Sequence, residues 1–251
     1  MRQLLMTVPI GALAVLGASM GIAQDGGEGM VGRSYDLGGF EEVSVVGPHH
    51  VVISVGPAYS VRAEGPQQAL DDTEVEVEGG RLKIQPIDER WERRRRDRDY
   101  WEDYEPVTFH ITLPRISAVS LVGGADMQVD RVEGREFSAS VAGSGELDVA
   151  VLRVDDARFS IAGAGDLIAR GSAQRSRVSI AGSGNLRARE MKSDEARVSI
   201  AGSGNAVLAV EDDARISLVG GGDVEIVGSA RCSVSRIGGG RVRCGEENVA
   251  S

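Results

Sequence analysis

The sequence has 251 residues, a formal net charge of −10 and 34 glycines, and only 4% of its residues are aromatic. The acidic balance argues against nucleic acid as a partner, because phosphate binding requires a basic surface. With so few aromatic side chains, a core must be built from Val, Ile, Leu and Ala in thin layers. That composition favours a stacked repeat over a globular core with large aromatic anchors.

Residues 1–23 have the features of a secretory signal peptide. Arg2 gives a positive start, residues 4–16 form an apolar core, and residues 21–23 (Gly-Ile-Ala) form a small-x-Ala cleavage site. A transmembrane anchor is the alternative, but the apolar run is short for a bilayer span of about 20 residues. No second apolar run is long enough to span. The mature chain is therefore expected to have no transmembrane segment and to be exported, to the periplasm, the cell surface or the extracellular medium.

The first part of the mature chain is irregular. Residues 24–36 are expected to form a flexible N-terminus, since they are rich in glycine and polar residues. A helical turn is predicted at 67–72, and the alternation of Glu and Val at 74–78 predicts a half-exposed strand. This region is expected to cap one end of the domain. Further short strands, several of them ending at Gly-Pro, are predicted at 43–46, 51–55, 59–63, 82–84 and 107–113.

Residues 88–105 interrupt this pattern. They contain six Arg, eight acidic residues, both tryptophans and two of the four tyrosines, with no glycine and no aliphatic residue. One interpretation is a solvated, charge-balanced insertion. The other is a contact surface, because Trp, Tyr and Arg dominate the binding energy of protein interfaces. The candidate contact residues are Trp91, Arg94, Arg95, Tyr100, Trp101 and Tyr104.

A motif exemplified by residues 199–205 (Ser-Ile-Ala-Gly-Ser-Gly-Asn) occurs seven times, in steps of 18 to 20 residues. A unit of that size cannot bury its own apolar face, so stacked units must bury one another's faces. Apolar and polar residues alternate before each Gly-x-Gly corner, where glycine allows positive φ and close approach of neighbouring coils. The motif predicts an all-β fold, a parallel β-solenoid in a single domain over residues 37–244, followed by a polar tail at 245–251. The leading serines are Ser120, Ser140, Ser160, Ser179, Ser199, Ser217 and Ser235.

One arginine recurs at the same position of four coils, as Arg158, Arg177, Arg197 and Arg215. An acidic residue lies two positions before three of them and can offset the repulsion between stacked like charges. Two interpretations stay open. The arginines form either a solvated ion-pair ladder along one edge or a binding stripe for acidic or carboxylated polymers.

The two cysteines, Cys232 and Cys244, lie six residues on either side of Gly238. If the chain reverses at this glycine, the thiols can face each other, and in an oxidising compartment they are a disulfide candidate. The alternative is two small buried thiols on different coils. A zinc site is not expected, because two sulfurs alone do not complete its coordination and no histidine lies nearby.

Catalytic and metal motifs are largely missing from the sequence. The serines of the Gly-Ser-Gly corners recur with the repeat and are expected to be structural rather than nucleophilic. His49 and His50 are adjacent, so in a strand they point to opposite faces and cannot chelate one metal, and His110 is the third and last histidine. No metal and no cofactor are expected. Corner acids that could line the face of a polysaccharide-active enzyme are Asp126, Glu146, Asp166 and Asp223, but nothing marks two of them as an acid/base pair.

The repeats at 179–185 and 199–205, together with Phe40-Glu-Glu-Val-Ser-Val-Val-Gly and Ile111-Thr-Leu-Pro-Arg-Ile, resemble an exported bacterial family called the "putative auto-transporter adhesin head GIN domain" (DUF2807). The resemblance covers about residues 37–243 and implies a β-solenoid at the cell envelope, without catalytic residues. The insertion at 88–105 and the cysteine pair depart from it. The expected function is a non-enzymatic, adhesin-like binding module or structural module. Its expected partner is an envelope polysaccharide or protein, and its oligomeric state is left open. The alternative is a polysaccharide-active enzyme on the same scaffold.

Overall fold

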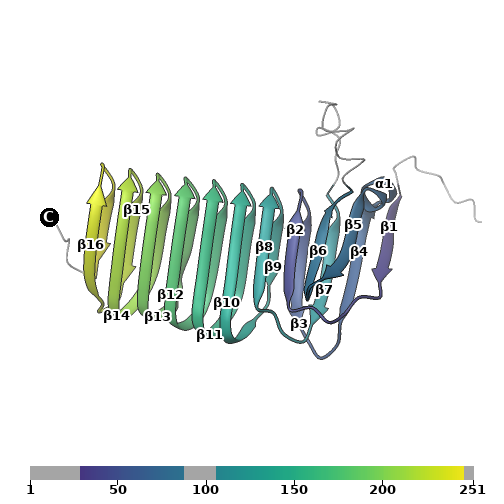
Figure 1. Ribbon diagram of the computed structural model, residues 1–251, viewed down its shortest axis with the longest axis horizontal. Coiled ribbons are helices and arrows are strands. Elements are labelled where there is room, and N and C mark those ends of the chain that lie inside the picture. Colours follow the sequence, from purple (N-terminus) through teal and green to yellow (C-terminus); the bar gives the residue numbers. More distant parts are fainter. Residues whose placement is uncertain (1–28, 88–105, 246–251) are drawn as a thin grey trace, which may run out of the picture.

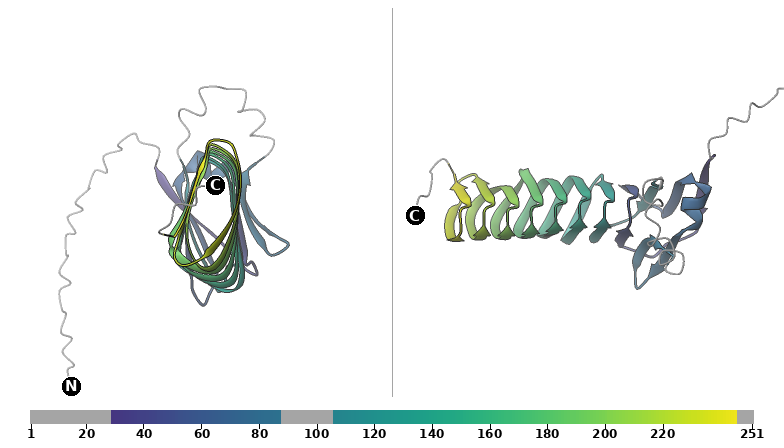
Figure 2. Two further views of the ribbon diagram at one scale, coloured as in Figure 1. Left: turned by 90° about the vertical axis from the view of Figure 1, so that its left-hand side faces the viewer. Right: turned by 90° about the horizontal axis from the view of Figure 1, so that it is seen from above.

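The computed structural model describes residues 29–87 and 106–245 and confirms the predicted β-solenoid. Coils stack into a rod, and each coil is a flattened oval when viewed along the rod (Figures 1 and 2). The strands of the regular part are β8 (Ala118–Gly123), β9 (Asp126–Val129), β10 (Val132–Gly143), β11 (Glu146–Gly163), β12 (Asp166–Gly182), β13 (Asn185–Gly202), β14 (Asn205–Gly220), β15 (Asp223–Val227), β16 (Arg231–Ile237) and β17 (Arg241–Cys244).

Neighbouring coils are parallel and keep the register of the sequence motif. Ser160 of β11 pairs with Ser179 of β12, which pairs with Ser199 of β13, and the pairing continues to Ser217 of β14. Strands β11 to β14 run without a break around the bend that joins the two walls of a coil, so each contributes to both walls. The predicted repeat is thus the structural repeat.

The glycine that opens each corner has a backbone conformation that other residues rarely adopt. Gly182, Gly202 and Gly220 have φ values of 127°, 132° and 130°. A Cβ atom on Gly220 would lie 2.1 Å from the carbonyl oxygen of Gly202 in the preceding coil. That carbonyl accepts a hydrogen bond from the amide of Gly221, at 2.9 Å. The corner therefore needs glycine both for its φ and for contact between coils.

The order of coils in space differs from their order in the chain. Strands β2 (Glu42–Val46) and β3 (His50–Val55) pair with β8 and β9, so they extend the solenoid by one coil. On their other side they pair with β6 (Arg81–Pro86) and β7 (Thr108–Leu113). In the coil formed by β2 and β3, the corner lies between these two strands. In the coil formed by β6 and β7, the corresponding corner is where residues 88–105 are inserted in the sequence.

Antiparallel strands cap this end of the rod, as the sequence predicted. β4 (Ser60–Pro66) pairs with β7, β5 (Thr73–Glu78) pairs with β6, and β1 (Met30–Tyr35) pairs with β4. The predicted helical turn is α1 (Gln67–Asp71), which buries Ala69 and Leu70. The expectation of a flexible segment over 24–36 is wrong for residues 30–35, because the open edge of β4 supplies hydrogen-bond partners for them.

The core runs along the axis of the rod in thin layers, as the composition predicted. It is built mainly from Val, Ile, Leu and Ala. All four phenylalanines are buried in it, and they belong to the capped half and the first repeats: Phe40, Phe109, Phe137 and Phe159.

Candidate binding surface

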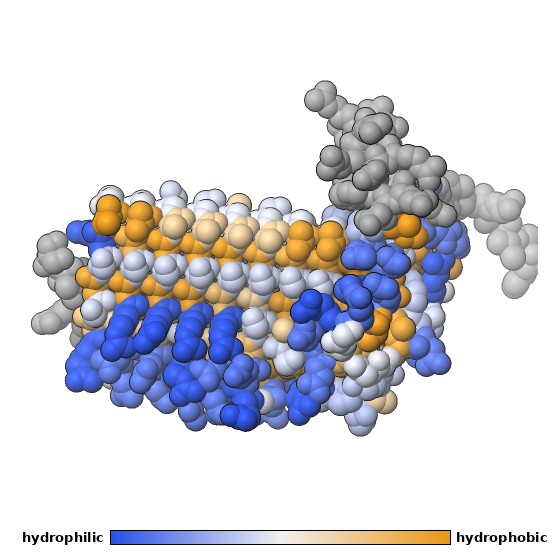
Figure 3. Space-filling model, in the orientation of Figure 1, coloured by the Kyte–Doolittle hydropathy of each residue, from blue (hydrophilic) through white to orange (hydrophobic). Residues whose placement is uncertain are grey.

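One wall of the solenoid carries outward side chains of the same type from coil to coil. In Arg197-Val198-Ser199-Ile200, the valine and isoleucine are buried while the arginine and serine are exposed. In-register pairing then stacks Arg158, Arg177, Arg197 and Arg215, which we call the arginine column. The serines two residues later form a parallel serine column. Figure 3 shows these columns as a strongly hydrophilic stripe beside a paler one, both running along the rod.

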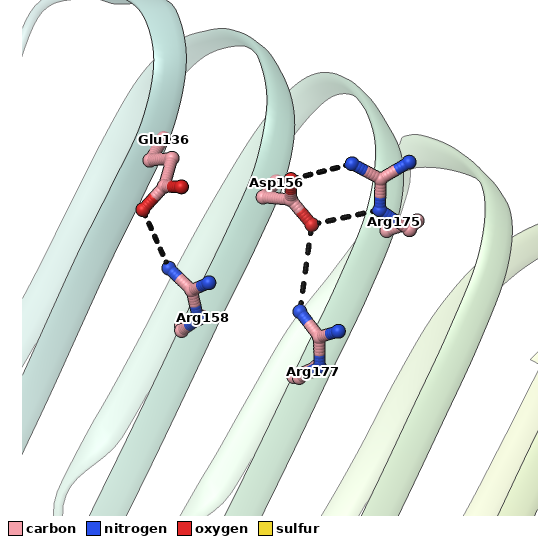
Figure 4. Close-up of polar contacts among 5 residues, drawn as sticks. All are labelled: Glu136, Asp156, Arg158, Arg175 and Arg177. Atoms are coloured by element: carbon pink, nitrogen blue, oxygen red, sulfur yellow. Dashed lines mark hydrogen bonds and ion pairs between the residues drawn. The ribbon is translucent and has the colours of Figure 1, made fainter.

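Ion pairs occupy the start of the arginine column (Figure 4). Glu136 accepts a hydrogen bond from Arg158 at 2.9 Å. Asp156 binds Arg175 through both oxygens, at 2.6 and 2.9 Å, and lies 3.4 Å from Arg177. The hydrogen bond from Arg175 lowers the pKa of Asp156. Ion pairs between neighbouring coils therefore exist, and they involve the first two arginines of the column.

Two of the acids that lie two residues before the arginines form ion pairs with arginines of the next coil. Asp156 lies two residues before Arg158 but contacts Arg177 of the next coil, and Asp213 contacts Arg231 of the next coil at 3.0 Å instead of Arg215. The reason is geometric. Residues i and i+2 of a strand are about 7 Å apart, whereas residues paired across neighbouring strands are about 4.8 Å apart.

The rest of the column borders a shallow groove. Within the described residues, Arg197 and Arg215 form no ion pair, and both side chains are exposed. A groove of about 430 Å³ runs beside them, across four successive coils. Its polar lining is Arg177, Arg197, Arg215, Ser199, Ser217, Ser233 and Ser235. The other lining residues are Val178, Val198 and Ile216, which are buried, and Val234, which is half-buried.

The acids at the corners form a second column, on the other side of the corner glycines. Hydrogen bonds connect its members: Asn185 donates to Asp166 at 2.8 Å, and Asn205 donates to Asn185 at 2.9 Å. Asp223 accepts from Arg241 at 2.7 Å, and this bond lowers its pKa. A general acid for glycoside cleavage needs a raised pKa. The geometry thus gives the corner acids a structural part and does not favour the enzyme alternative.

The histidines lie at the capped end. His49 is fully buried at a corner, with its ring edge-on to Phe109 at a centroid distance of 5.5 Å, while His50 is exposed and lies 3.5 Å from Asp126. Burial, with a smaller effect of His50, lowers the pKa of His49 to about 4. Across residues 29–87 and 106–245, no group of three or more His, Cys, Asp or Glu is arranged to hold a metal ion.

The last coil, formed by β16 and β17, is stabilised by a disulfide and by a side-chain hydrogen bond within the coil. A disulfide joins Cys232 and Cys244, whose Cα atoms are 6.4 Å apart, and links the two walls of the coil. Arg236 stands where the preceding coil has Leu218, and it donates a hydrogen bond to the carbonyl of Gly240 at 2.8 Å. The sequence carried a signal for this bond, because the cysteine pair and Arg236 are both departures from the repeat and fall in one terminal coil.

Loss of this disulfide is expected to loosen the last coil alone. Replacing both cysteines with serine should cost about 2 kcal/mol of local stability, since the bond closes a short loop. Faster hydrogen exchange in β16 and β17, with unchanged exchange in β12, is the expected result. An intact-mass comparison under reducing and non-reducing conditions tests the bond itself, and two free thiols in protein from an oxidising compartment would contradict it.

The sequence-predicted contact residues in the 88–105 insertion, from Trp91 to Tyr104, lie outside the described residues. So do the predicted signal peptide and the last residues of the predicted tail.

A family model described as "Putative auto-transporter adhesin, head GIN domain" (DUF2807) matches residues 39–230. The chain belongs to this family. Among curated proteins, no relative matches it. In this DUF2807 protein, the matched residues begin just before β2 and end just before β16, so they include every coil except the last, and the cap except β1.

Solved structures share the fold of this DUF2807 protein. A "putative adhesin" from Bacteroides fragilis is 18% identical with a TM-score of 0.74, and the match covers 86% of this chain and 97% of that one. A "Putative lipid binding protein" from Parabacteroides distasonis is 19% identical with a TM-score of 0.65, covering 85% of this chain and 95% of that one. None of the helices in the described part of this chain is long and apolar enough to cross a membrane.

Proposed function

We propose that this protein is an exported, non-enzymatic binding module of the bacterial cell envelope, and that the wall with the arginine and serine columns holds its partner. The observation that carries the proposal is the in-register repetition of exposed side chains along this wall. A surface that repeats at every coil suits a partner that is itself repetitive, such as a polymer. Membership of a family described as adhesin-like supports a binding role.

A sedimentation assay tests this function. The mature protein is mixed with the envelope fraction of the bacterium that encodes it, and the bound share is measured. Replacing Ser199 and Ser217 together with glutamate places bulk and negative charge in the middle of the wall. We expect the variant to bind at least ten-fold less than the unchanged protein. The matched control carries the same two charges at the exposed residues Ala150 and Ser172, outside the groove, and should bind normally.

Each outcome has a consequence. If the unchanged protein does not sediment with the envelope fraction, the binding function is wrong. If both variants lose binding equally, the wall is not the contact surface. A third variant without residues 88–105 tests the alternative contact surface from the sequence. Loss of binding in that variant alone would assign the contact to the insertion.

A further inference from the structure

The groove beside Arg197 and Arg215 combines a recess with positive charge. We propose that it binds an acidic polysaccharide, whose carboxylates pair with these two arginines and whose hydroxyl groups bond to the serine column. This assignment rests on the function proposed above and names the chemical class of its partner.

The charge pattern leaves these two arginines for a partner from outside the chain. Arg158 is neutralised by Glu136, and Arg177 lies near Asp156. Arg197 and Arg215 lie on successive coils and have no ion-pair partner among the described residues. Stacked like charges repel, so a ligand that supplies an anion to each arginine relieves the repulsion. A guanidinium binds carboxylate through two parallel hydrogen bonds, which gives orientation as well as attraction.

The groove has the remaining groups that a sugar chain requires. Ser199, Ser217 and Ser235 stand in a row beside the arginines, and each hydroxyl can both donate and accept a hydrogen bond. Val198 and Ile216 lie between the two columns but are buried in the core, so the groups available to a sugar chain are the guanidinium and hydroxyl groups. Because the lining residues come from β12, β13, β14 and β16, the groove runs along the rod. An extended chain can therefore contact several coils at once.

The surroundings favour this partner over other polyanions. Glu195 and Asp213 lie two residues before Arg197 and Arg215, and the whole chain carries a net charge of −10. These charges oppose the dense phosphates of a nucleic acid. Apolar side chains are exposed two residues beyond the serines, at Val219 and Ile237, but the groove itself is a recess between arginine and serine side chains, which suits a polar anionic chain better than a membrane surface. A polysaccharide whose carboxylates are more widely spaced than the phosphates of a nucleic acid fits the two arginines best.

Titration calorimetry with polygalacturonate as the probe tests the proposal, with the same polymer after reduction of its carboxyl groups as the neutral reference. The Arg197→Gln/Arg215→Gln variant should bind polygalacturonate at least ten-fold more weakly than the unchanged protein. Arg197→Lys/Arg215→Lys should fall between the two, because lysine keeps the charge but loses the paired hydrogen bonds. The control Arg135→Gln/Arg243→Gln removes the same charge from exposed arginines outside the groove and should bind within two-fold of the unchanged protein. Circular dichroism before and after heating checks that all variants fold.

The proposal is overturned if the glutamine variant binds as well as the control, or if the carboxyl-reduced polymer binds as tightly as the acidic one. Tighter binding of duplex DNA or of anionic phospholipid vesicles, through the same arginines, would also overturn it. The envelope assay distinguishes failure of the proposed ligand class from failure of the proposed binding function. If the unchanged protein sediments and the glutamine variant does so equally well, the ligand class is wrong while the binding function stands. If the unchanged protein does not sediment, the function itself is wrong.

Discussion

Gly220→Ala is expected to lower the stability of the solenoid by about 4 kcal/mol, which corresponds to a fall of about 10 °C in the midpoint of thermal unfolding for a chain of this size. Two effects add together. The φ of Gly220 is 130°, a value that alanine rarely adopts, and the new Cβ would lie 2.1 Å from the carbonyl oxygen of Gly202. The coils on either side must then separate, which weakens the hydrogen bonds of the corner.

The neighbouring glycine supplies the control. A Cβ on Gly221 would lie 3.8 Å from the nearest atom, the hydroxyl oxygen of Ser203, and the φ of Gly221 is not positive. The chain already has alanine at the equivalent corner position, Ala164. Gly221→Ala should therefore change stability by less than about 0.5 kcal/mol. Equal midpoints for the two variants, measured by circular dichroism, would show that the corner tolerates a side chain and that the glycines are not required for stacking.

Acid is expected to destabilise the capped end of the protein through His49. The pKa of this histidine is lowered to about 4 by burial, from an ordinary value of 6.5. Since the folded state binds the proton more weakly than the unfolded state, stability is complete above pH 6.5 and falls as the pH drops towards 4. The loss over this window is about 3 kcal/mol. Carboxylates with lowered pKa, such as Asp156 and Asp223, add to the loss at lower pH.

Urea unfolding at a series of pH values measures this effect. His49→Leu places a side chain that cannot be protonated at the buried position. In this variant the free energy of unfolding should change much less between pH 6.5 and 4. The control is His110→Gln on β7, where the histidine is exposed, and it should keep the dependence of the unchanged protein. Identical curves for all three proteins would mean that His49 does not control the acid response.

The sequence alone predicted the regular coils because their register follows from counting. Once the leading serines are aligned, the arginine column is determined and the glycines fall at the corners. The coil of β2 and β3 was also within reach, since Val43-Ser44-Val45-Val46-Gly47 matches Val119-Ser120-Leu121-Val122-Gly123 residue by residue. The match was hidden because Pro48-His49-His50 stands where the next coil has Gly124-Ala125-Asp126.

Other features depend on distances between residues in the folded chain, which a sequence motif does not give. Which arginines are neutralised depends on side chains reaching the next coil, a step shorter than the step along a strand. The pairing of residues 30–35 with β4 depends on an edge that exists only once the cap has folded. Asp156 reaches Arg177 and Asp213 reaches Arg231, while Arg197 and Arg215 form no ion pair among the described residues, and this pattern is not visible in the spacing of charges.

The interleaved order of the coils has a consequence for folding kinetics. Partners in the regular coils are close in sequence: Asp156 meets Arg175, 19 residues away. In contrast, Ser117 donates to the carbonyl of Glu41, 76 residues away, because β2 is held between β6 and β8. Contacts between nearby residues form faster than contacts that close a long loop. The coils from β10 to β14 can therefore nucleate first and serve as the template on which the earlier-synthesised N-terminal strands assemble last.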